Sequence, residues 1–254
     1  MTASESPGRS KSQADIGIVC ALPIEIGDFL NRCSRVRKYT GGDFVFKGGV
    51  YGEIRIVVVI CGMGFLRARR ATEALIEAHS PGWIISTGFC GALQPEMRIG
   101  DIVVADSVAD THGNIINLPP GLKSNPAKGL YVGRVLTADD FVRSVQEKAE
   151  LAAAHAAQAV EMESMAVAQI CRDRKLRCMV VRSVSDDMSS DLPPEVLSLV
   201  GATGSVRFGA AIGSLIKKPS SAKQMWQLRE NAHQAAERLA AFLDGVVVQL
   251  HESL

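Results

Sequence analysis

The sequence predicts an α/β fold, a single-domain three-layer sandwich with a central mixed and twisted sheet. Short apolar runs rich in β-branched residues alternate with helical stretches almost throughout the chain, a pattern typical of layered α/β domains. The 254 residues are 47% apolar and 22% charged, which suits one large buried core rather than a disordered chain. We expect a polar, Ser-rich tail over residues 1–14 and one folded domain over residues 15–254.

The amino-terminal half of the domain begins this alternation. Strands are predicted over residues 16–22, 44–49, 54–62 and 83–93, where apolar and β-branched residues dominate. A helix is predicted over residues 24–33, because Pro23 suits the start of a helix. Another is predicted over residues 65–79, between the glycine turn at residues 61–64 and the Pro-Gly pair at residues 81–82.

The carboxyl-terminal half continues it. Strands are predicted over residues 101–109, 130–138, 159–163 and 178–185, and helices over residues 144–157 and 164–175. Residues 110–129 are rich in Pro and Gly and are expected to form a loop. The last segment is predicted to be helical, because its apolar residues follow the spacing of one helix face. That face consists of Leu239, Phe242, Leu243, Val246, Val247 and Leu250.

Composition argues against several classes of function. A net charge of +1 gives no broad attraction to nucleic acid or to an anionic membrane. No apolar run approaches about 18 residues, so no transmembrane segment is predicted. The six cysteines form no CxxC pair, and no metal-ligand spacing is present. We therefore expect reduced thiols, no bound metal and a cytoplasmic protein.

Acidic residues gather where two predicted strands end. Residues 161–163 (Glu-Met-Glu) lie at a strand-to-helix junction, and residues 185–187 (Ser-Asp-Asp) end the following strand. Ligands of open α/β sheets bind at the carboxyl ends of strands, and half-buried carboxylates there must be paired, hydrogen-bonded or protonated. The alternative is structural: Glu163 and Ser164 could cap a helix, and Asp187 could cap a turn.

Four segments, in this order, resemble motifs of the nucleoside phosphorylase/nucleosidase superfamily. They are IGIVCALPIEI, STGFCGALQPEMRIGDIVV, LTADDFV, and VEMES followed by VVRSVSDD. They cover roughly residues 15–190 and resemble methylthioadenosine/S-adenosylhomocysteine nucleosidases and related purine nucleoside phosphorylases. The resemblance implies a phosphorylase-like catalytic domain that cleaves the N-glycosidic bond of a purine nucleoside without a cofactor.

The resemblance also implies a role for individual residues. Asp186 corresponds to the general acid at the purine N7, and Glu25 to the carboxylate that activates water. Glu163 would hold the ribose hydroxyls, with Met162 packed on the sugar, and Phe141 would stack on the base. The other residues implied to bind substrate are Glu161, Val142, Phe89, Cys90, Gly91 and Ser185.

These roles suit the chemistry. Cleaving an N-glycosidic bond builds an oxocarbenium-like sugar and moves electrons into the base, so an acid and a base on opposite sides of the bond both help. Asp186 must therefore carry or share a proton when the bond breaks. Help of this kind is typically worth about 10²–10⁴ in rate.

The attacking group can be water or phosphate. A phosphorylase binds phosphate as a co-substrate, through N–H groups at a helix N-terminus and an arginine. Gly64 and Arg67 are the candidates, and an ordinary glycine turn before a solvent-facing helix is the alternative. Glu25 would repel phosphate and suits the activation of water. The sequence therefore favours a hydrolase, with a phosphate-dependent phosphorylase as the alternative.

The chain departs from the nucleosidase pattern near the sugar. Phe89 and Cys90 replace smaller residues before Gly91, and the segment between residues 106 and 130 lacks a helix that many members insert near the 5′ pocket. The stretches FVRSVQEKAEL, DLPPEVLSLVGATG and RFGAAIGSLIKKP resemble a bacterial branch associated with hopanoid biosynthesis. The expected substrate is thus a 5′-substituted adenosine of the methylthioadenosine/S-adenosylhomocysteine type, or alternatively adenosylhopane.

An alternative of another class is a nucleoside-binding sensor without turnover. The presence of three acids, Glu25, Glu163 and Asp186, argues against it, because binding alone does not need an acid at each position. Members of the resembled family usually form homo-oligomers, so we expect one here, with a purine nucleoside rather than nucleic acid as its ligand.

Overall fold

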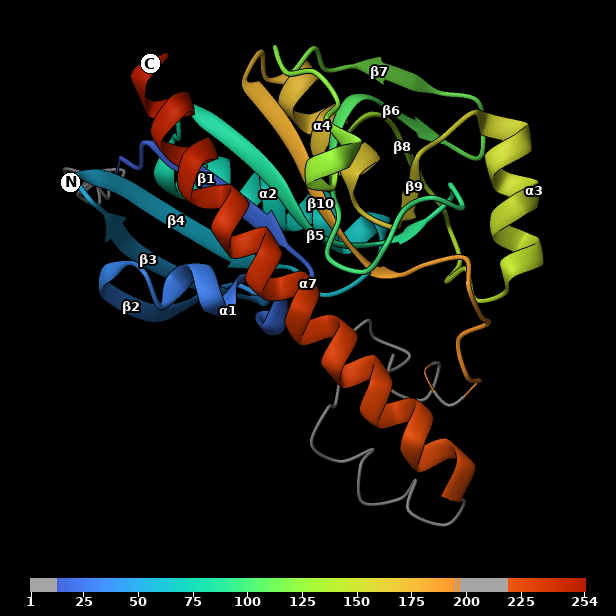
Figure 1. Cartoon of the computed structure of the whole chain (residues 1–254). Coiled ribbons are helices and arrows are strands. Elements are labelled where there is room, and N and C mark those ends of the chain that lie inside the picture. Colours follow the sequence, from blue (N-terminus) through green and yellow to red (C-terminus); the bar gives the residue numbers. More distant parts are fainter. Residues whose placement is uncertain (1–12, 195, 197–218) are drawn as a thin grey trace, which may run out of the picture.

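The computed structural model describes residues 13–194, residue 196 and residues 219–254 (Figure 1). Most of the predicted tail over residues 1–14, and most of the stretches DLPPEVLSLVGATG and RFGAAIGSLIKKP, lie outside the described residues. Ala14 was predicted in the tail but belongs to the fold, because it is buried and its N–H donates to the His79 carbonyl at 3.0 Å.

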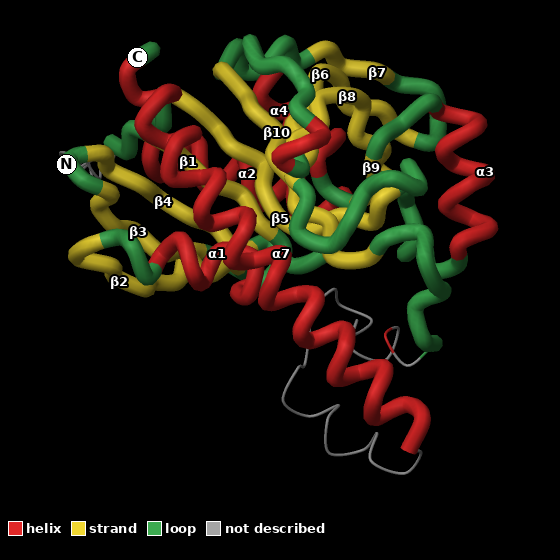
Figure 2. The backbone as a smooth tube through the Cα atoms, viewed as in Figure 1, coloured by secondary structure: helices red, strands yellow, loops and turns green. Residues whose placement is uncertain are grey.

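Strands and helices alternate as predicted (Figure 2). The strands are β1 (Ile16–Cys20), β2 (Ser34–Gly41), β3 (Phe44–Tyr51), β4 (Ile54–Ile60), β5 (Trp83–Ala92), β6 (Ile102–Asp110), β7 (Ile115–Asn117), β8 (Leu130–Thr137), β9 (Ala159–Glu161) and β10 (Arg177–Asp186). The helices are α1 (Pro23–Leu30), α2 (Phe65–His79), α3 (Val145–His155), α4 (Ser164–Asp173) and α7 (Pro219–Glu252), with a 3-10 turn η1 at Pro126–Lys128.

The sheet is mixed, which confirms the predicted fold class. Its strand order is β10-β6-β8-β9-β5-β1-β4-β3-β2, with β7 paired to β6. Strand β5 pairs with both β9 and β10, so β5, β9, β8, β6 and β10 close into a ring, and β1 to β4 extend it. Strands β1, β4, β5 and β10 run parallel, so their carboxyl ends meet at one edge, where ligands of α/β sheets bind.

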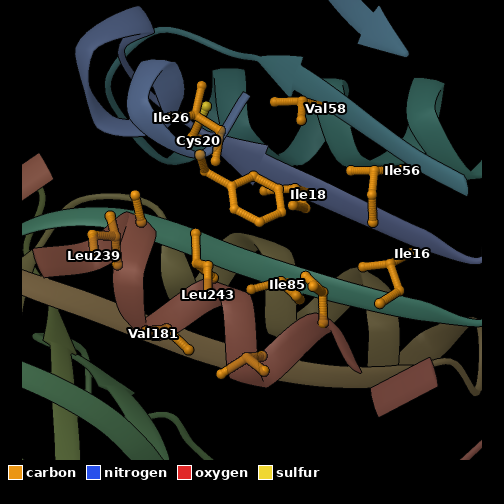
Figure 3. Packing of buried hydrophobic residues seen from close by; sticks show 14 of the residues in the cluster. Ile16, Ile18, Cys20, Ile26, Ile56, Val58, Ile85, Val181, Leu239 and Leu243 are labelled. Atoms are coloured by element: carbon orange, nitrogen blue, oxygen red, sulfur yellow. The ribbon is translucent and has the colours of Figure 1, made fainter. Parts of the chain in front are cut away.

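The side chains of β1 point alternately to the two faces of the sheet, and different helices cover each face. Ile16 and Ile18 point to the face covered by α1 and α7, where they pack with Leu239 and Leu243 (Figure 3). Val19 points to the opposite face and packs with residues of α2 and α4. Successive side chains of a strand point to opposite faces, and here both faces are buried. Helices therefore cover both sides of the sheet, and the domain has three layers.

The carboxyl-terminal helix confirms its predicted apolar face, since five of the six predicted residues are buried and Phe242 packs against them. Helix α7 is long, and its first turns extend beyond the body of the domain (Figure 1), where Trp226 is 60% exposed. None of the helices in the described part of the chain is long and apolar enough to cross a membrane.

The sequence missed two strands. Strand β2 is an edge strand paired only with β3, and its residues are almost all exposed. It therefore lacks the apolar alternation that marks a half-buried strand. Strand β7 is short and lies in the stretch predicted as a loop. The rest of residues 110–129 contains no α-helix, in agreement with the predicted absence of an inserted helix.

Candidate active site

Most of the predicted site residues lie at the ends of β1, β4, β5, β9 and β10 or just after them. Two groups of charged residues occupy this edge. We call Glu25, Glu161, Glu163 and Arg182 the arginine–carboxylate cluster, and Lys148 with Asp186 the lysine–aspartate pair.

Arg182 lies at the centre of the arginine–carboxylate cluster. It projects from β10, is 1% exposed, and its Nη2 donates to Glu161 Oε2, Ser86 Oγ and Ser164 Oγ. Burial opposes its charge, but the carboxylates of Glu161, Glu163 and Glu25 more than offset this and raise the pKa of Arg182. Arg182 is therefore a fixed positive charge beneath the site.

Glu161 ends β9 and is fully engaged inside the protein. Its oxygens accept hydrogen bonds from Thr137 Oγ1 at 2.6 Å, from the N–H groups of Glu163 and Ser164, and from Arg182. The Ser164 amide opens α4, so the carboxylate also complements the positive end of that helix. The prediction that Glu161 binds substrate is therefore wrong: no oxygen of this carboxylate is free, and its role is to hold Arg182 and the start of α4.

Glu25 occupies the first turn of α1 and is buried. Its Oε2 accepts the Leu22 N–H at 2.7 Å, and its Oε1 accepts the Phe89 N–H at 3.0 Å. Burial raises the pKa of Glu25, although the Phe89 hydrogen bond and the charge of Arg182 oppose the shift. A carboxylate whose pKa is raised is a stronger base toward water.

Glu163 reaches across to the start of α2. Its Oε1 accepts the Gly64 N–H at 2.6 Å, and Gly64 is the residue before the first turn of that helix. Burial raises the pKa of Glu163 to about 8, and the negative charge of Glu161 adds to the shift. The capping alternative for Glu163 fails for its own helix, since its side chain makes no capping hydrogen bond to α4.

Asp186 ends β10 directly opposite Gly91 of β5. Its Oδ1 pairs with the Lys148 ammonium, and its Oδ2 accepts the Ser185 hydroxyl at 2.9 Å. The Lys148 side chain is fully buried, whereas that of Asp186 is 15% exposed. Asp186 thus contacts a buried cation through one oxygen, and its side chain remains partly exposed.

Two glycines make room for these groups. A Cβ on Gly88 would lie 2.6 Å from Arg182 Nη1 and 2.7 Å from Glu25 Oε1, and the φ of Gly88 is +151°. A Cβ on Gly91 would lie 3.0 Å from Asp186 Oδ1. The glycines of the STGFCG segment therefore bring the β5 backbone close to both charged groups.

The remaining predicted substrate residues surround this edge. Phe89, Phe141, Met162 and Ser185 are half-buried. Val142 is also half-buried, and it packs against the cluster that contains Leu136 and Val160. Cys90 is buried in the core with Met165 and Val184, so its thiol is not available to a ligand. Its backbone carbonyl lies nearer the site and accepts a long hydrogen bond from the Ser185 hydroxyl.

The proposed phosphate residues are engaged elsewhere. The Gly64 amide donates to Glu163, and Arg67 Nε donates to the Cys61 carbonyl at 2.6 Å while its guanidinium lies over Phe44. Asp187 caps a turn, as the structural alternative predicted, because its Oδ1 accepts the Ser189 N–H at 2.9 Å. Within the described residues, no group of three or more His, Cys, Asp or Glu side chains is placed to hold a metal ion.

Sequence reasoning missed Arg182 and Lys148. Arg182 interrupts the apolar run MVVRSV, and a charge inside a buried strand must be paired. Lys148 stands three and four residues before Leu151 and Ala152, which face the core. A lysine in the apolar stripe of a helix is therefore the signal that could have identified it.

Comparisons with known proteins identify the family of this chain. Residues 15–247 match the family model described as the phosphorylase superfamily. A 5′-methylthioadenosine/S-adenosylhomocysteine nucleosidase of Staphylococcus aureus (strain JH9) is 29% identical over 197 residues, covering 67% of this chain and 86% of that protein.

Solved structures share the fold. A 5′-methylthioadenosine/S-adenosylhomocysteine nucleosidase of Helicobacter pylori aligns with a TM-score of 0.70 and 22% identity, over 95% of this chain and 99% of that one. The futalosine hydrolase of Helicobacter pylori aligns with a TM-score of 0.67 and 21% identity, over 94% and 97%. One architecture thus carries enzymes named for different substrates, so the substrate of this chain must be argued from its own site.

Proposed function

Because this chain belongs to the phosphorylase superfamily, an enzyme family, we propose that it is a purine nucleosidase that hydrolyses the N-glycosidic bond of a 5′-substituted adenosine and releases adenine. The nucleosidase reaction follows its relatives, and the choice of water over phosphate rests on the site itself.

The observation that carries hydrolysis is the occupation of the α2 N-terminus by Glu163. A helix N-terminus is where a protein would bind phosphate, but the Gly64 amide there donates to a carboxylate instead. Arg67 donates its Nε to a backbone carbonyl. The charge of Arg182 is already directed to the carboxyl groups of Glu161, Glu163 and Glu25, so a further anion would find these donors engaged.

Glu25 is proposed to activate the attacking water. Two backbone N–H groups fix its carboxyl, and burial raises its pKa. In the reaction the water oxygen bonds to C1′ while its proton passes to Glu25, and the C1′–N9 electron pair leaves with the base. The charge of Arg182 opposes the rise in the Glu25 pKa and so favours the ionised carboxylate that accepts that proton.

Asp186 is proposed to protonate the leaving adenine at N7, and Glu163 to hold the ribose hydroxyls. Neutralising the leaving base lowers the cost of breaking the bond. Phe141 and the backbone of Val142 would hold the purine, and Met162 would pack on the sugar. These roles place the acid and the base on opposite sides of the scissile bond, as glycoside hydrolysis requires.

The 5′ substituent is the least constrained part of the substrate. Residues 110–129 contribute the short β7 and the 3-10 turn η1 but no α-helix. We therefore propose that the enzyme accepts 5′-substituted adenosines, with methylthioadenosine and S-adenosylhomocysteine as the first candidates and adenosylhopane as a bulkier one.

The test is a panel of purine nucleosides assayed for base release with and without phosphate. The panel contains methylthioadenosine, S-adenosylhomocysteine, adenosylhopane, futalosine and unsubstituted adenosine. We expect adenine and a free sugar from at least one 5′-substituted adenosine in phosphate-free buffer. Strict dependence on phosphate, with a sugar 1-phosphate as product, would instead establish a phosphorylase.

The same panel separates an enzyme from a sensor. Tight binding of a nucleoside measured by calorimetry, without release of base at saturating enzyme, would contradict the proposed hydrolysis. Glu25→Gln is the informative variant, because it keeps the size of the side chain and removes the base. We expect it to bind substrate and to lose most of its hydrolytic rate.

A further inference from the structure

Lys148 is the buried cation of the site. It lies on the inner face of α3 and its side chain is fully buried. Its three ammonium hydrogens have three acceptors: Asp186 Oδ1, the Asp186 carbonyl at 3.3 Å and the Asp187 carbonyl at 3.0 Å. Every hydrogen bond that Lys148 can donate therefore goes to the end of β10.

This arrangement exceeds what anchoring the strand requires. A buried ammonium has a large desolvation cost, which a neutral donor to the two carbonyls would avoid. The carboxylate of Asp186 compensates for that cost, and it is the acid that the proposed reaction needs. A Cβ at position 91 would lie 3.2 Å from Lys148 Cε and 3.0 Å from Asp186 Oδ1. Gly91 therefore leaves room for the two side chains to stay in contact.

The two oxygens of Asp186 differ in how firmly they are held. Oδ1 is bound to the Lys148 ammonium, whose other two hydrogens are already donated to the Asp186 and Asp187 carbonyls. Oδ2 accepts the Ser185 hydroxyl, which also lies 3.4 Å from the Cys90 carbonyl. A hydroxyl can rotate to that second acceptor, so Oδ2 is the oxygen that can be released to a ligand.

Resting on the proposed function, we propose that Lys148 is a positioning residue for protonation of the leaving base. It holds Asp186 by Oδ1, directs Oδ2 to the purine N7, and stabilises the carboxylate that remains after Asp186 has given its Oδ2 proton to N7. The proton moves from Asp186 to the base, the C1′–N9 electron pair goes with the base, and Lys148 keeps its charge throughout.

The neighbouring titratable groups do not replace this charge. On β5, Cys90 is held neutral because burial raises the pKa of its thiol. On β10, Asp187 turns its carboxylate to the Ser189 amide, and Arg182 is bound to Glu161. Residues of β9 beside the pair are apolar, with Val160 against Gly91. Lys148 is thus the cation in contact with Asp186.

The test compares pH–rate profiles of wild type, Lys148→Met and Lys148→Gln, with Lys38→Met on the exposed strand β2 as the matched control. Without the ammonium, the carboxylate left on Asp186 after the proton transfer is less stable. We expect kcat to fall by roughly tenfold or more, and the alkaline limb of the kcat profile to move upward by about one pH unit or more. KM should change much less, and Lys38→Met should match wild type.

Lys148→Gln guards against a folding defect, because its amide still donates to the strand end while the charge is gone. The two variants should show the same displaced limb. In an Asp186→Asn background, Lys148→Gln should cost nothing further, because Lys148 acts through Asp186. A lower kcat with an unmoved limb, or full additivity with Asp186→Asn, would overturn the inference. An inactive wild type would instead overturn the proposed function.

Discussion

The arginine–carboxylate cluster and the lysine–aspartate pair both contain a buried cation, but their carboxylates are engaged to different extents. Both place a cation against a carboxylate below the surface. In the cluster, Glu161 and Arg182 are almost fully buried, and Glu161 accepts hydrogen bonds on both oxygens. In the pair, Lys148 is buried but Asp186 remains partly exposed and has one oxygen with an exchangeable partner.

The difference distinguishes a carboxylate that supports the fold from one that can still act on a substrate. A carboxylate with all its lone pairs engaged can fix neighbouring groups but has nothing to offer a substrate. A carboxylate held from one side keeps its geometry and still reacts on the other. Glu161 is therefore assigned to the scaffold, and Asp186, under the proposed function, to the chemistry. The predictions below test that division.

The largest effect is expected from Asp186→Asn. The asparagine amide cannot transfer a proton to the purine N7, so the rate of base release should fall by a factor of roughly 10²–10⁴. The matched control is Asp187→Asn, because the Asp187 side chain accepts the Ser189 amide of a turn and the change leaves the Asp187 carbonyl, which accepts from Lys148, in place. Steady-state kcat/KM of both variants is the measurement. Equal losses in the two variants would contradict the assignment.

A loss of stability is expected from Arg182→Met. The change leaves Glu161 buried without its cation, which typically costs on the order of 3–5 kcal/mol. Arg174→Met is the matched control, since Arg174 pairs with Glu77 at 3.4 Å on the surface, and such pairs contribute at most about 1 kcal/mol. Urea unfolding measures both. If Arg182→Met unfolds at the same urea concentration as Arg174→Met, Arg182 is not the centre of the scaffold.

A smaller, pH-dependent effect is expected from Glu163→Gln. The folded protein holds the Glu163 proton up to about pH 8, whereas the carboxyl ordinarily titrates near 4.5. The stability this provides is complete below about pH 4.5 and is lost as the pH rises to about 8. Over that window, the free energy of unfolding of wild type should fall by on the order of a few kcal/mol more than that of Glu163→Gln.

Parallel unfolding curves at a series of pH values give this comparison directly. Equal pH dependence in wild type and variant would show that Glu163 is ionised in the folded protein. The measurement also bears on the reaction, because a protonated Glu163 would donate a hydrogen bond to the sugar rather than only accept one.

Much of the fold could be predicted because its causes are local. Apolar runs such as IGIVCAL predicted the buried strands, and proline and glycine marked where helices begin and end. Strand β2 was missed because an exposed edge strand needs no apolar alternation. The closure of β5 against β9 and β10 could not be predicted, since pairing between strands distant in sequence leaves no local pattern.

The candidate site, like the fold, could be predicted only in part. The motifs identified Glu25, Glu163 and Asp186 as acids at strand ends, and the structure brings their strand ends to one edge of the sheet. Glu161, in the same motif, was assigned to the substrate because its sequence neighbours suggested it. Its side chain instead faces Arg182 and Thr137, and only the packing of β8, β9 and β10 decides that direction.

By itself, the sequence determined the layered α/β fold and the family, and it identified the acids that we propose for cleaving a glycosidic bond, because these depend on short patterns of residues. The tertiary structure alone decided which acid is engaged and which is open, and it brought Lys148 of α3 against Asp186 of β10. The physical reason is that the reactivity of a carboxylate depends on its burial and its partners, and those partners come from elements far apart in the chain.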